Sequence, residues 1–71
     1  MLFNVEYNPE GEVLIVLDQE GLEILYQNLQ QLKEKPNHVH LMSPSNGGWE
    51  LTETEPKTGN LLIHQLTIYS R

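Results

Sequence analysis

The sequence predicts a small α+β domain, in which one helix packs on a four- to five-stranded, mainly antiparallel sheet as a two-layer sandwich. Three observations predict this class. Apolar runs of strand length occur in both halves of the chain, one segment between them has an apolar period near 3.6, and clusters of Pro, Gly, Asn and Ser separate the runs. The expected element order is ββαβ(β)β, and residues 1–71 form a single domain.

The N-terminal part of the chain predicts a hairpin. In Leu2–Tyr7, apolar residues alternate with Asn4 and Glu6, as in a strand with one buried face. Asn8–Gly11 has the proline and glycine of a turn. Glu12–Leu17 follows with an apolar run on both faces that is rich in β-branched residues. This second run predicts a strand in the centre of the sheet, paired with the first.

A helix is expected between Asp18 and Pro36. The carboxylate of Asp18 can accept hydrogen bonds from free amides of the first turn, and Pro36 restricts the residue before it and so ends the helix. An apolar stripe at helical spacing predicts the buried side of the helix. It consists of Leu22, Leu25, Tyr26, Leu29 and Leu32.

The second half of the chain predicts shorter strands separated by loops. His38–Met42 reads as a short strand, Ser43–Gly48 as a loop, Trp49–Thr54 as an irregular strand and Leu61–Tyr69 as a long final strand. The final strand and the central one are apolar on both sides, so some apolar residues must lie away from the helix. We therefore expect either a homodimer or a partner site on that face.

Charge narrows the class of partner. The chain has four Lys and Arg residues and ten Asp and Glu residues, for a formal net charge of −6. Such a surface repels phosphate backbones and the four cations are scattered, so we expect no direct binding to nucleic acid. The acidic surface suits a basic partner, and it equally serves to keep the protein in solution.

Length and composition exclude other classes. A chain of 71 residues without cysteine forms no disulfide and is too short for a large catalytic cleft between domains. No apolar run approaches the roughly 20 residues of a membrane-spanning helix. The first residues lack the basic flank of a signal peptide, so we expect a cytoplasmic protein without membrane contact.

The three histidines are the first candidates for chemistry. His38 and His40 are two residues apart on an expected strand, so both side chains project from one face. His64 lies in another expected strand and joins them if the two strands pair. Three imidazoles can ligate zinc, copper or nickel, which makes a small His-dependent metal-binding protein an alternative function. The simpler explanation is strand histidines that bond to neighbouring groups, and we expect no cofactor.

A single tryptophan follows a glycine pair. Trp49 comes directly after Gly47 and Gly48, and a tryptophan beside a flexible loop is suited to anchor a protein interface. The alternative is that Trp49 covers the edge of a small core. Both interpretations fit the sequence equally well.

The acidic and hydroxyl residues of the same region predict no catalytic site. Glu50, Glu53 and Glu55 fit a solvated face better than a catalytic pair of carboxylates. Ser43 and Ser45 lack a nucleophile elbow or a glycine-rich phosphate loop. We therefore expect no enzyme activity.

Several stretches carry a family resemblance. They are Asp18–Leu22 at the start of the helix, Asn37–Met42 with the Gly47, Gly48 and tryptophan loop after it, and the Ile63–Tyr69 ending. Together they resemble immunity protein 32, a family of small bacterial immunity proteins from polymorphic toxin systems, over nearly the whole chain. The sequence departs from the family pattern in two places. The tryptophan follows the glycine pair instead of preceding it, and a glutamine stands where a second histidine often occurs.

The resemblance implies a non-enzymatic protein that binds and neutralises a cognate toxin. With the acidic surface, it suggests a basic toxin such as a nuclease as the partner. A homodimeric structural protein remains a further alternative. The residues expected to contact the partner are His38, His40, Trp49, Glu50 and His64, with Glu53 at the rim.

Overall fold

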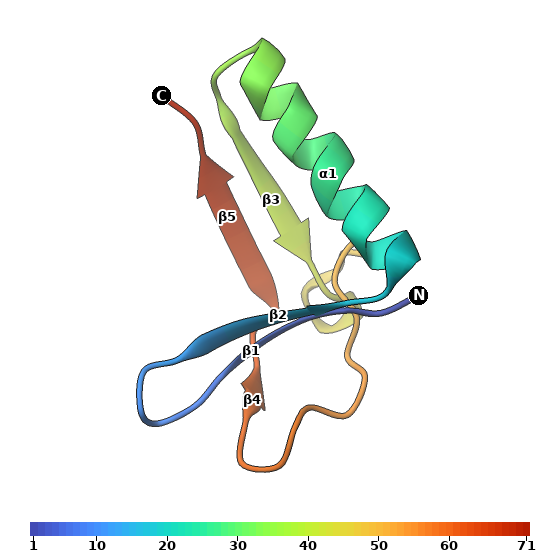
Figure 1. Cartoon of the computed structure of the whole chain (residues 1–71), viewed down its shortest axis with the longest axis vertical. Coiled ribbons are helices and arrows are strands. Elements are labelled where there is room, and N and C mark those ends of the chain that lie inside the picture. The colour runs from blue at the N-terminus through green and yellow to red at the C-terminus, as the bar shows by residue number, and fades with distance from the viewer.

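A computed structural model describes residues 1–71 and contains one α-helix and five strands (Figure 1). This confirms the α+β class and the antiparallel ββαβ…β order. The elements, in chain order, are β1 (Phe3–Tyr7), β2 (Val13–Leu17), α1 (Gln19–Glu34), β3 (His38–Met42), the 3-10 helix η1 (Pro44–Asn46), β4 (Leu61–Leu62) and β5 (Gln65–Tyr69).

The five strands divide between two sheets. One sheet has the order β2-β1-β4, and the other pairs β3 with β5. The expected long strand Leu61–Tyr69 is therefore broken into two strands at Ile63 and His64. The amide of Ile63 donates to the carbonyl oxygen of Val5 (2.8 Å), whereas the carbonyl oxygen of His64 accepts from the amide of Ser43 (3.0 Å). Neighbouring residues thus bond to different sheets, and the chain crosses from one sheet to the other at this point.

The expected hairpin is confirmed. β1 and β2 pair antiparallel from Phe3 opposite Leu17 to Tyr7 opposite Val13. Asn8 closes the turn between them, because its side-chain oxygen accepts from the amide of Glu12 (3.0 Å). In Figure 1 the tip of this hairpin extends to the left beyond β4 and β5.

The order of the strands differs from the prediction, because β1 and not β2 is central. Asn4 and Glu6, expected on the open face of a half-buried strand, are both buried. Polar groups from residues 52–60 cover them: the hydroxyl of Thr52 donates to Oδ1 of Asn4 (2.6 Å), and the amide of Lys57 donates to Oε1 of Glu6 (3.1 Å). This distant segment satisfies the polar face of β1 and leaves β2 at the edge of the sheet.

The helix begins and ends where the sequence predicts. The Asp18 side chain accepts from the amide of Gly21 (2.8 Å), and this bond lowers the pKa of Asp18. Gly21 itself is buried, and a Cβ there would overlap the carbonyl oxygen of Leu2. Helix and β1 therefore meet closely at this glycine. The chain leaves the helix through Lys35 ahead of Pro36.

This contact turns the helix relative to the predicted stripe. The inward side carries Gly21, Leu32 and, packed on the core, Ile24 and Leu25. The other predicted stripe residues are only about half covered, with exposed fractions of 47% for Leu22, 55% for Tyr26 and 45% for Leu29.

The core lies between the hairpin, α1 and the inner face of β3 and β5. Phe3, Val5, Leu41 and Leu51 are fully or almost fully buried. The residues packed around them are Leu17, Ile24, Leu25, Val39, Ile63, Leu66 and Ile68.

The segment Trp49–Thr54, expected as an irregular strand, forms no strand. It nevertheless joins the two sheets, because the amide of Leu51 donates to Met42 on β3 (3.1 Å) and the amide of Thr52 donates to Phe3 on β1 (2.8 Å). No helix in the structure has the length and apolar character needed to cross a membrane.

Candidate functional site

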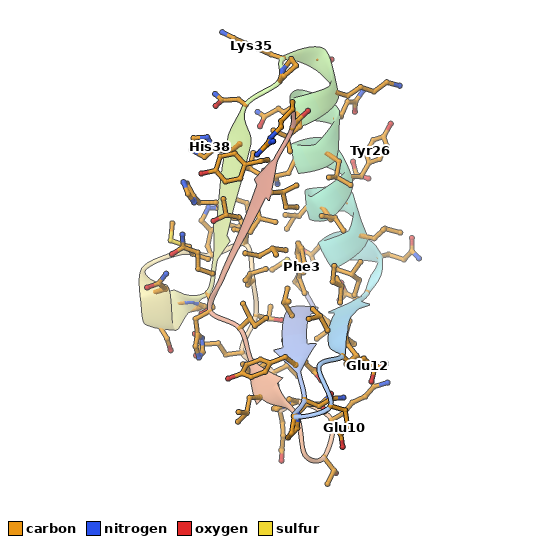
Figure 2. The ribbon with its side chains drawn as sticks, turned by 90° about the vertical axis from the view of Figure 1, so that its left-hand side faces the viewer. Phe3, Glu10, Glu12, Tyr26, Lys35 and His38 are labelled. Carbon is orange, nitrogen blue, oxygen red and sulfur yellow. The ribbon has the colours of Figure 1, made fainter.

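The outward side of β3 and β5 forms one continuous surface of histidine, aromatic and polar side chains. In the register of these strands, His38 lies opposite Tyr69 and His40 opposite Thr67. Paired residues share a face, and the opposite face carries the core residues of both strands. We call the outward surface the histidine face: His38, His40, Gln65, Thr67 and Tyr69. Figure 2 shows His38 on the side of the molecule opposite Tyr26 of α1.

Ring contacts and hydrogen bonds order this face. The rings of His38 and Tyr69 lie 5.0 Å apart at a tilt of 32°, and the rings of His38 and His40 meet edge to face at 4.8 Å. Nδ1 of His40 lies 3.0 Å from the Thr67 hydroxyl and 3.2 Å from the side-chain nitrogen Nε2 of Gln65. The two histidines are thus held by neighbours, and both residues are exposed to solvent.

His64 lies apart from this face, at the point where the chain passes between the sheets. Its Nδ1 is 2.8 Å from the hydroxyl of Ser43 and 3.6 Å from Oε2 of Glu53. Glu53 also accepts from the amide of Ser45 (2.6 Å) and from its hydroxyl (2.8 Å). The amide of Ser45, and then the hydroxyls of Ser43 and Ser45, lower the pKa of Glu53 to about 2.

Serine, histidine and glutamate are also the residue types of a hydrolytic triad. In a triad one imidazole nitrogen takes the proton of the serine, while the other nitrogen donates to the acid, which orients the ring and stabilises its charged form. Here Ser43 and Glu53 both approach Nδ1 of His64, and Ser43 is fully buried. This arrangement fits a structural tie between β3, η1 and the segment that contains Glu53.

The three histidines do not form a metal site. No group of three or more His, Cys, Asp or Glu side chains in the structure is placed to hold a metal ion. His38 and His40 share a face as expected, but the break before β5 directs His64 to Ser43 and Glu53. The alternative of a three-histidine metal centre therefore lacks its ligand set.

Trp49 is exposed, with 66% of its surface open to solvent. The two glycines before it have separate roles: Gly47 adopts a φ of +80°, and a Cβ on Gly48 would overlap the backbone of Met42. The loop is thereby pressed against β3, and Oε1 of Glu50 accepts from the amide of Met42 (3.1 Å). Trp49 projects beside α1, where it borders a shallow hollow of about 150 Å³ lined by Ile24, Gln27, Asn28 and Gln31.

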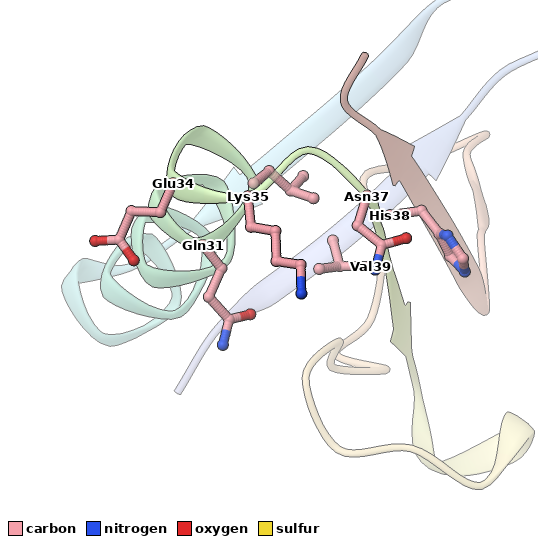
Figure 3. Close-up of a pocket in the computed structure, with 7 residues that line it drawn as sticks. Gln31, Glu34, Lys35, Asn37, His38 and Val39 are labelled. Carbon is pink, nitrogen blue, oxygen red and sulfur yellow. The ribbon is translucent and has the colours of Figure 1, made fainter.

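A second hollow, of about 280 Å³, lies between the end of α1 and the start of β3. Figure 3 shows Glu34 and Lys35 from the helix end on one side and Asn37 and His38 on the other. It is open and mostly polar, and through His38 it adjoins the histidine face. Neither Glu34 nor Lys35, the other titratable residues of this hollow, forms a hydrogen bond or ion pair with His38.

The sequence of the chain matches immunity protein 32 over residues 12–66. The chain belongs to the immunity protein 32 family. Comparisons with curated proteins and with solved structures give no match. The stretch matched to the immunity protein 32 family contains all six residues expected to contact a partner, and it leaves out β1, which is the central strand of its sheet.

In this member of the immunity protein 32 family, the six expected residues occupy three places. His38 and His40 lie on the histidine face, and Glu53 and His64 lie beside η1. Trp49 and Glu50 lie on the loop after η1, with Trp49 beside α1 and Glu50 bonded to the amide of Met42. The Gln65 side chain links the first two places, since its Oε1 accepts from Nδ2 of Asn46 on η1 (2.9 Å). Gln65, Thr67 and Tyr69, which complete the histidine face, are not among the residues expected to contact a partner, although the alternation of the last strand places all three on one side.

Proposed function

We propose that the protein is an immunity protein that binds a cognate protein toxin and neutralises it by covering a surface that the toxin needs. Membership of the immunity protein 32 family is the observation that carries this proposal. The partner forms a complex with the folded domain, and the action is binding rather than catalysis. The shared use of Nδ1 of His64 by Ser43 and Glu53 supports binding over nucleophilic chemistry.

The charge of the chain supports a basic toxin, such as a nuclease. At a net charge of −6, the protein attracts a basic surface over several ångströms and speeds the encounter with it. An acidic protein over a basic nucleic-acid groove also occupies the place of the phosphate backbone.

We propose two contact regions from the six expected residues. Trp49 supplies a large exposed apolar anchor, and the histidine face supplies His38 and His40 as polar contacts on a rigid pair of strands. Glu50 and Glu53 already accept hydrogen bonds from backbone amides, so they mainly fix the loop that carries Trp49. His64 lies at the rim beside them.

The test is capture of the partner followed by neutralisation. Tagged protein is purified from its native cells, and each protein retained at equal stoichiometry is expressed in a neutral host with and without the immunity protein. A partner that stops growth alone and permits growth in the presence of the immunity protein supports the proposal. Retained proteins that have no effect on growth, with or without it, contradict it.

The contact region is tested with Trp49→Ala. A buried tryptophan anchor at a protein interface is worth roughly 2 kcal/mol or more, so we expect affinity for the captured toxin to fall about 30-fold. Leu29→Ala, which truncates another exposed apolar residue on α1, is the matched control and should leave affinity within about twofold. Equal affinities of the wild type and Trp49→Ala would remove Trp49 from the interface.

A further inference from the structure

β2 has a strand neighbour on one side only. It pairs with β1, and no other strand follows it in the order β2-β1-β4. An unpaired strand edge presents backbone donors and acceptors that can pair with another chain.

The hydrogen bonds of the hairpin identify which groups point to this edge. The amide of Asn8 donates to the carbonyl of Glu12, and the amide of Asp18 donates to that of Leu2. Bonded and non-bonded pairs alternate along an antiparallel ladder, so Leu14 and Val16 direct their backbone groups at β1. Val13, Ile15 and Leu17 consequently direct theirs away from the sheet. We call these three residues the free edge of β2.

The free edge is apolar and carries none of the usual protections. Edge strands commonly carry Lys, Pro or a bulge that prevents further pairing, whereas Val13–Leu17 contains no charged residue or proline and pairs with β1 without interruption. Val13 is 59% exposed and Ile15 48% exposed.

Further apolar surface adjoins this edge on the same face of the sheet. Tyr7 lies opposite both Val13 and Leu61 in the register, and all three share a face with Ile15. Tyr7 is 40% exposed and Leu61 57% exposed. Tyr7 and Val13 are the strand residues nearest the turn, so this face lies at the turn end of the hairpin, whose tip extends past β5 in Figure 1. An added strand would therefore find apolar neighbours as well as backbone partners.

The charged residues at the two ends of β2 indicate which kind of strand can pair with the free edge. The apolar run is followed by Asp18 and Glu20 and preceded by Glu10 and Glu12. The only cation with a close ion pair among these groups is the α-amino group of Met1, 3.8 Å from Asp18 and 3.4 Å from Glu20. The two ends of the edge therefore remain acidic and favour a strand with basic ends.

The same charges disfavour a second copy of the chain. The antiparallel self-pairing that uses all three outward residues sets Ile15 against its own copy and Val13 against Leu17 of that copy. It also sets Glu12 against the copy's Asp18 at both ends, and like charges placed directly opposite destabilise a strand pair.

We propose that the free edge of β2 receives an extended segment of the toxin as an additional antiparallel strand, with apolar residues at alternate positions and Lys or Arg at the ends. This inference rests on the proposed function and names the docking surface and the kind of segment that it takes. Backbone hydrogen bonds supply the pairing, and the alternate apolar side chains pack beside Val13 and Ile15.

The test uses a synthetic peptide of alternating Val and Thr with Lys at both ends, added to the full-length protein and followed by amide NMR. We expect shifts and new exchange protection at the amides of Val13, Ile15 and Leu17. The same peptide with a central Pro, and a version with Glu at both ends, should bind at least about tenfold more weakly. An interaction that leaves these three amides unprotected overturns the proposal.

Two variants separate backbone pairing from charge. Ile15→Pro removes an outward backbone amide without changing the charge. Its control, Ile15→Thr, keeps that amide and remains β-branched. We expect peptide binding to be about tenfold weaker for the proline variant only. Should Ile15→Pro unfold, Val13→Lys blocks the edge, and Leu29→Lys is its charge-matched control. Equal peptide binding by variant and control overturns the proposal.

Three further outcomes are decisive. A dimer in sedimentation, with the free-edge amides already protected without peptide, would place a second copy on the edge and overturn the proposal. If Ile15→Pro and Val13→Lys relieve toxicity as well as the wild type does, the edge proposal fails and the immunity function stands. If the peptide protects the free edge but the wild type neutralises no captured protein, the immunity function fails.

Discussion

The two strands of the N-terminal hairpin pair residue for residue and yet have opposite environments. Four of the five residues of β1 are buried, among them Asn4 and Glu6, whereas β2 exposes Val13 and Ile15 at the edge of the sheet. The difference is due to the partners of each strand: β1 lies between two strands and under residues 52–60, and β2 has one neighbour. Position in the sheet, more than apolar character, decides burial here.

The largest expected effect is a difference in stability between two separate truncations, at residues that lie opposite each other in β1 and β2. Val5 is fully buried, and Ile15, its register partner, is 48% exposed. Val5→Ala removes two methyl groups from the core and leaves a cavity, so we expect a loss of about 2 to 3 kcal/mol in the free energy of unfolding. Ile15→Ala should cost less than about 1 kcal/mol, because its side chain is half solvated already. Urea denaturation of both variants measures the two losses in the free energy of unfolding. Equal losses would contradict the different burial of β1 and β2.

A second variant tests the polar cover of β1. Glu6 accepts from the side-chain amides of Asn60 (3.0 Å) and Asn4 (3.2 Å) and from the amide of Lys57, and the Asn60 bond is the main cause of its lowered pKa. Glu6→Gln places an NH₂ group among these donors, and we expect a loss of roughly 1 to 3 kcal/mol.

The control for this variant is Glu12→Gln beside β2. Glu12 is exposed and accepts from the side chain of Asn8 (3.0 Å), so its replacement should change the free energy of unfolding by less than about 0.5 kcal/mol. If urea denaturation gives the same result for both variants, the carboxylate of Glu6 does not hold residues 52–60 on β1.

Acid should weaken the tie made by Glu53 in the other half of the molecule. The pKa of Glu53 is about 2 in the folded protein and near its ordinary value of 4.5 in the unfolded chain. Its stabilising effect is therefore fully present above pH 4.5 and is lost as the pH falls towards 2. In Glu53→Gln, the free energy of unfolding should depend less on pH over this range than in the wild type. Identical pH profiles would show that the contacts of Ser43 and Ser45 with Glu53 do not stabilise the fold.

Local signals explain which parts of the fold could be predicted. The hairpin turn at Asn8–Gly11, the Asp18 cap and the end of the helix before Pro36 depend on neighbouring residues, and all three are confirmed. The central position of β1 depends on bonds such as the one from the Asn4 side chain to the carbonyl of Thr54, 50 residues away. No local pattern contains that information.

The candidate site divides in the same way. The spacing of His38 and His40 correctly placed both on one face, because strand geometry alternates with a period of two. The stacking of His38 on Tyr69 depends on the register of β3 and β5, and the separation of His64 depends on the break at Ile63 and His64. Register and breaks arise from tertiary packing, so the sequence pattern predicted one shared face and not the whole arrangement.

Residue-resolved amide hydrogen exchange of the free protein tests the contrast between the two strands most directly. The amides of Leu14 and Val16 face β1 and should exchange slowly, whereas those of Val13, Ile15 and Leu17 should exchange close to the rate of an unstructured chain. Slow exchange at all five positions of β2, independent of protein concentration, would show that the edge is covered within the monomer and would contradict the account.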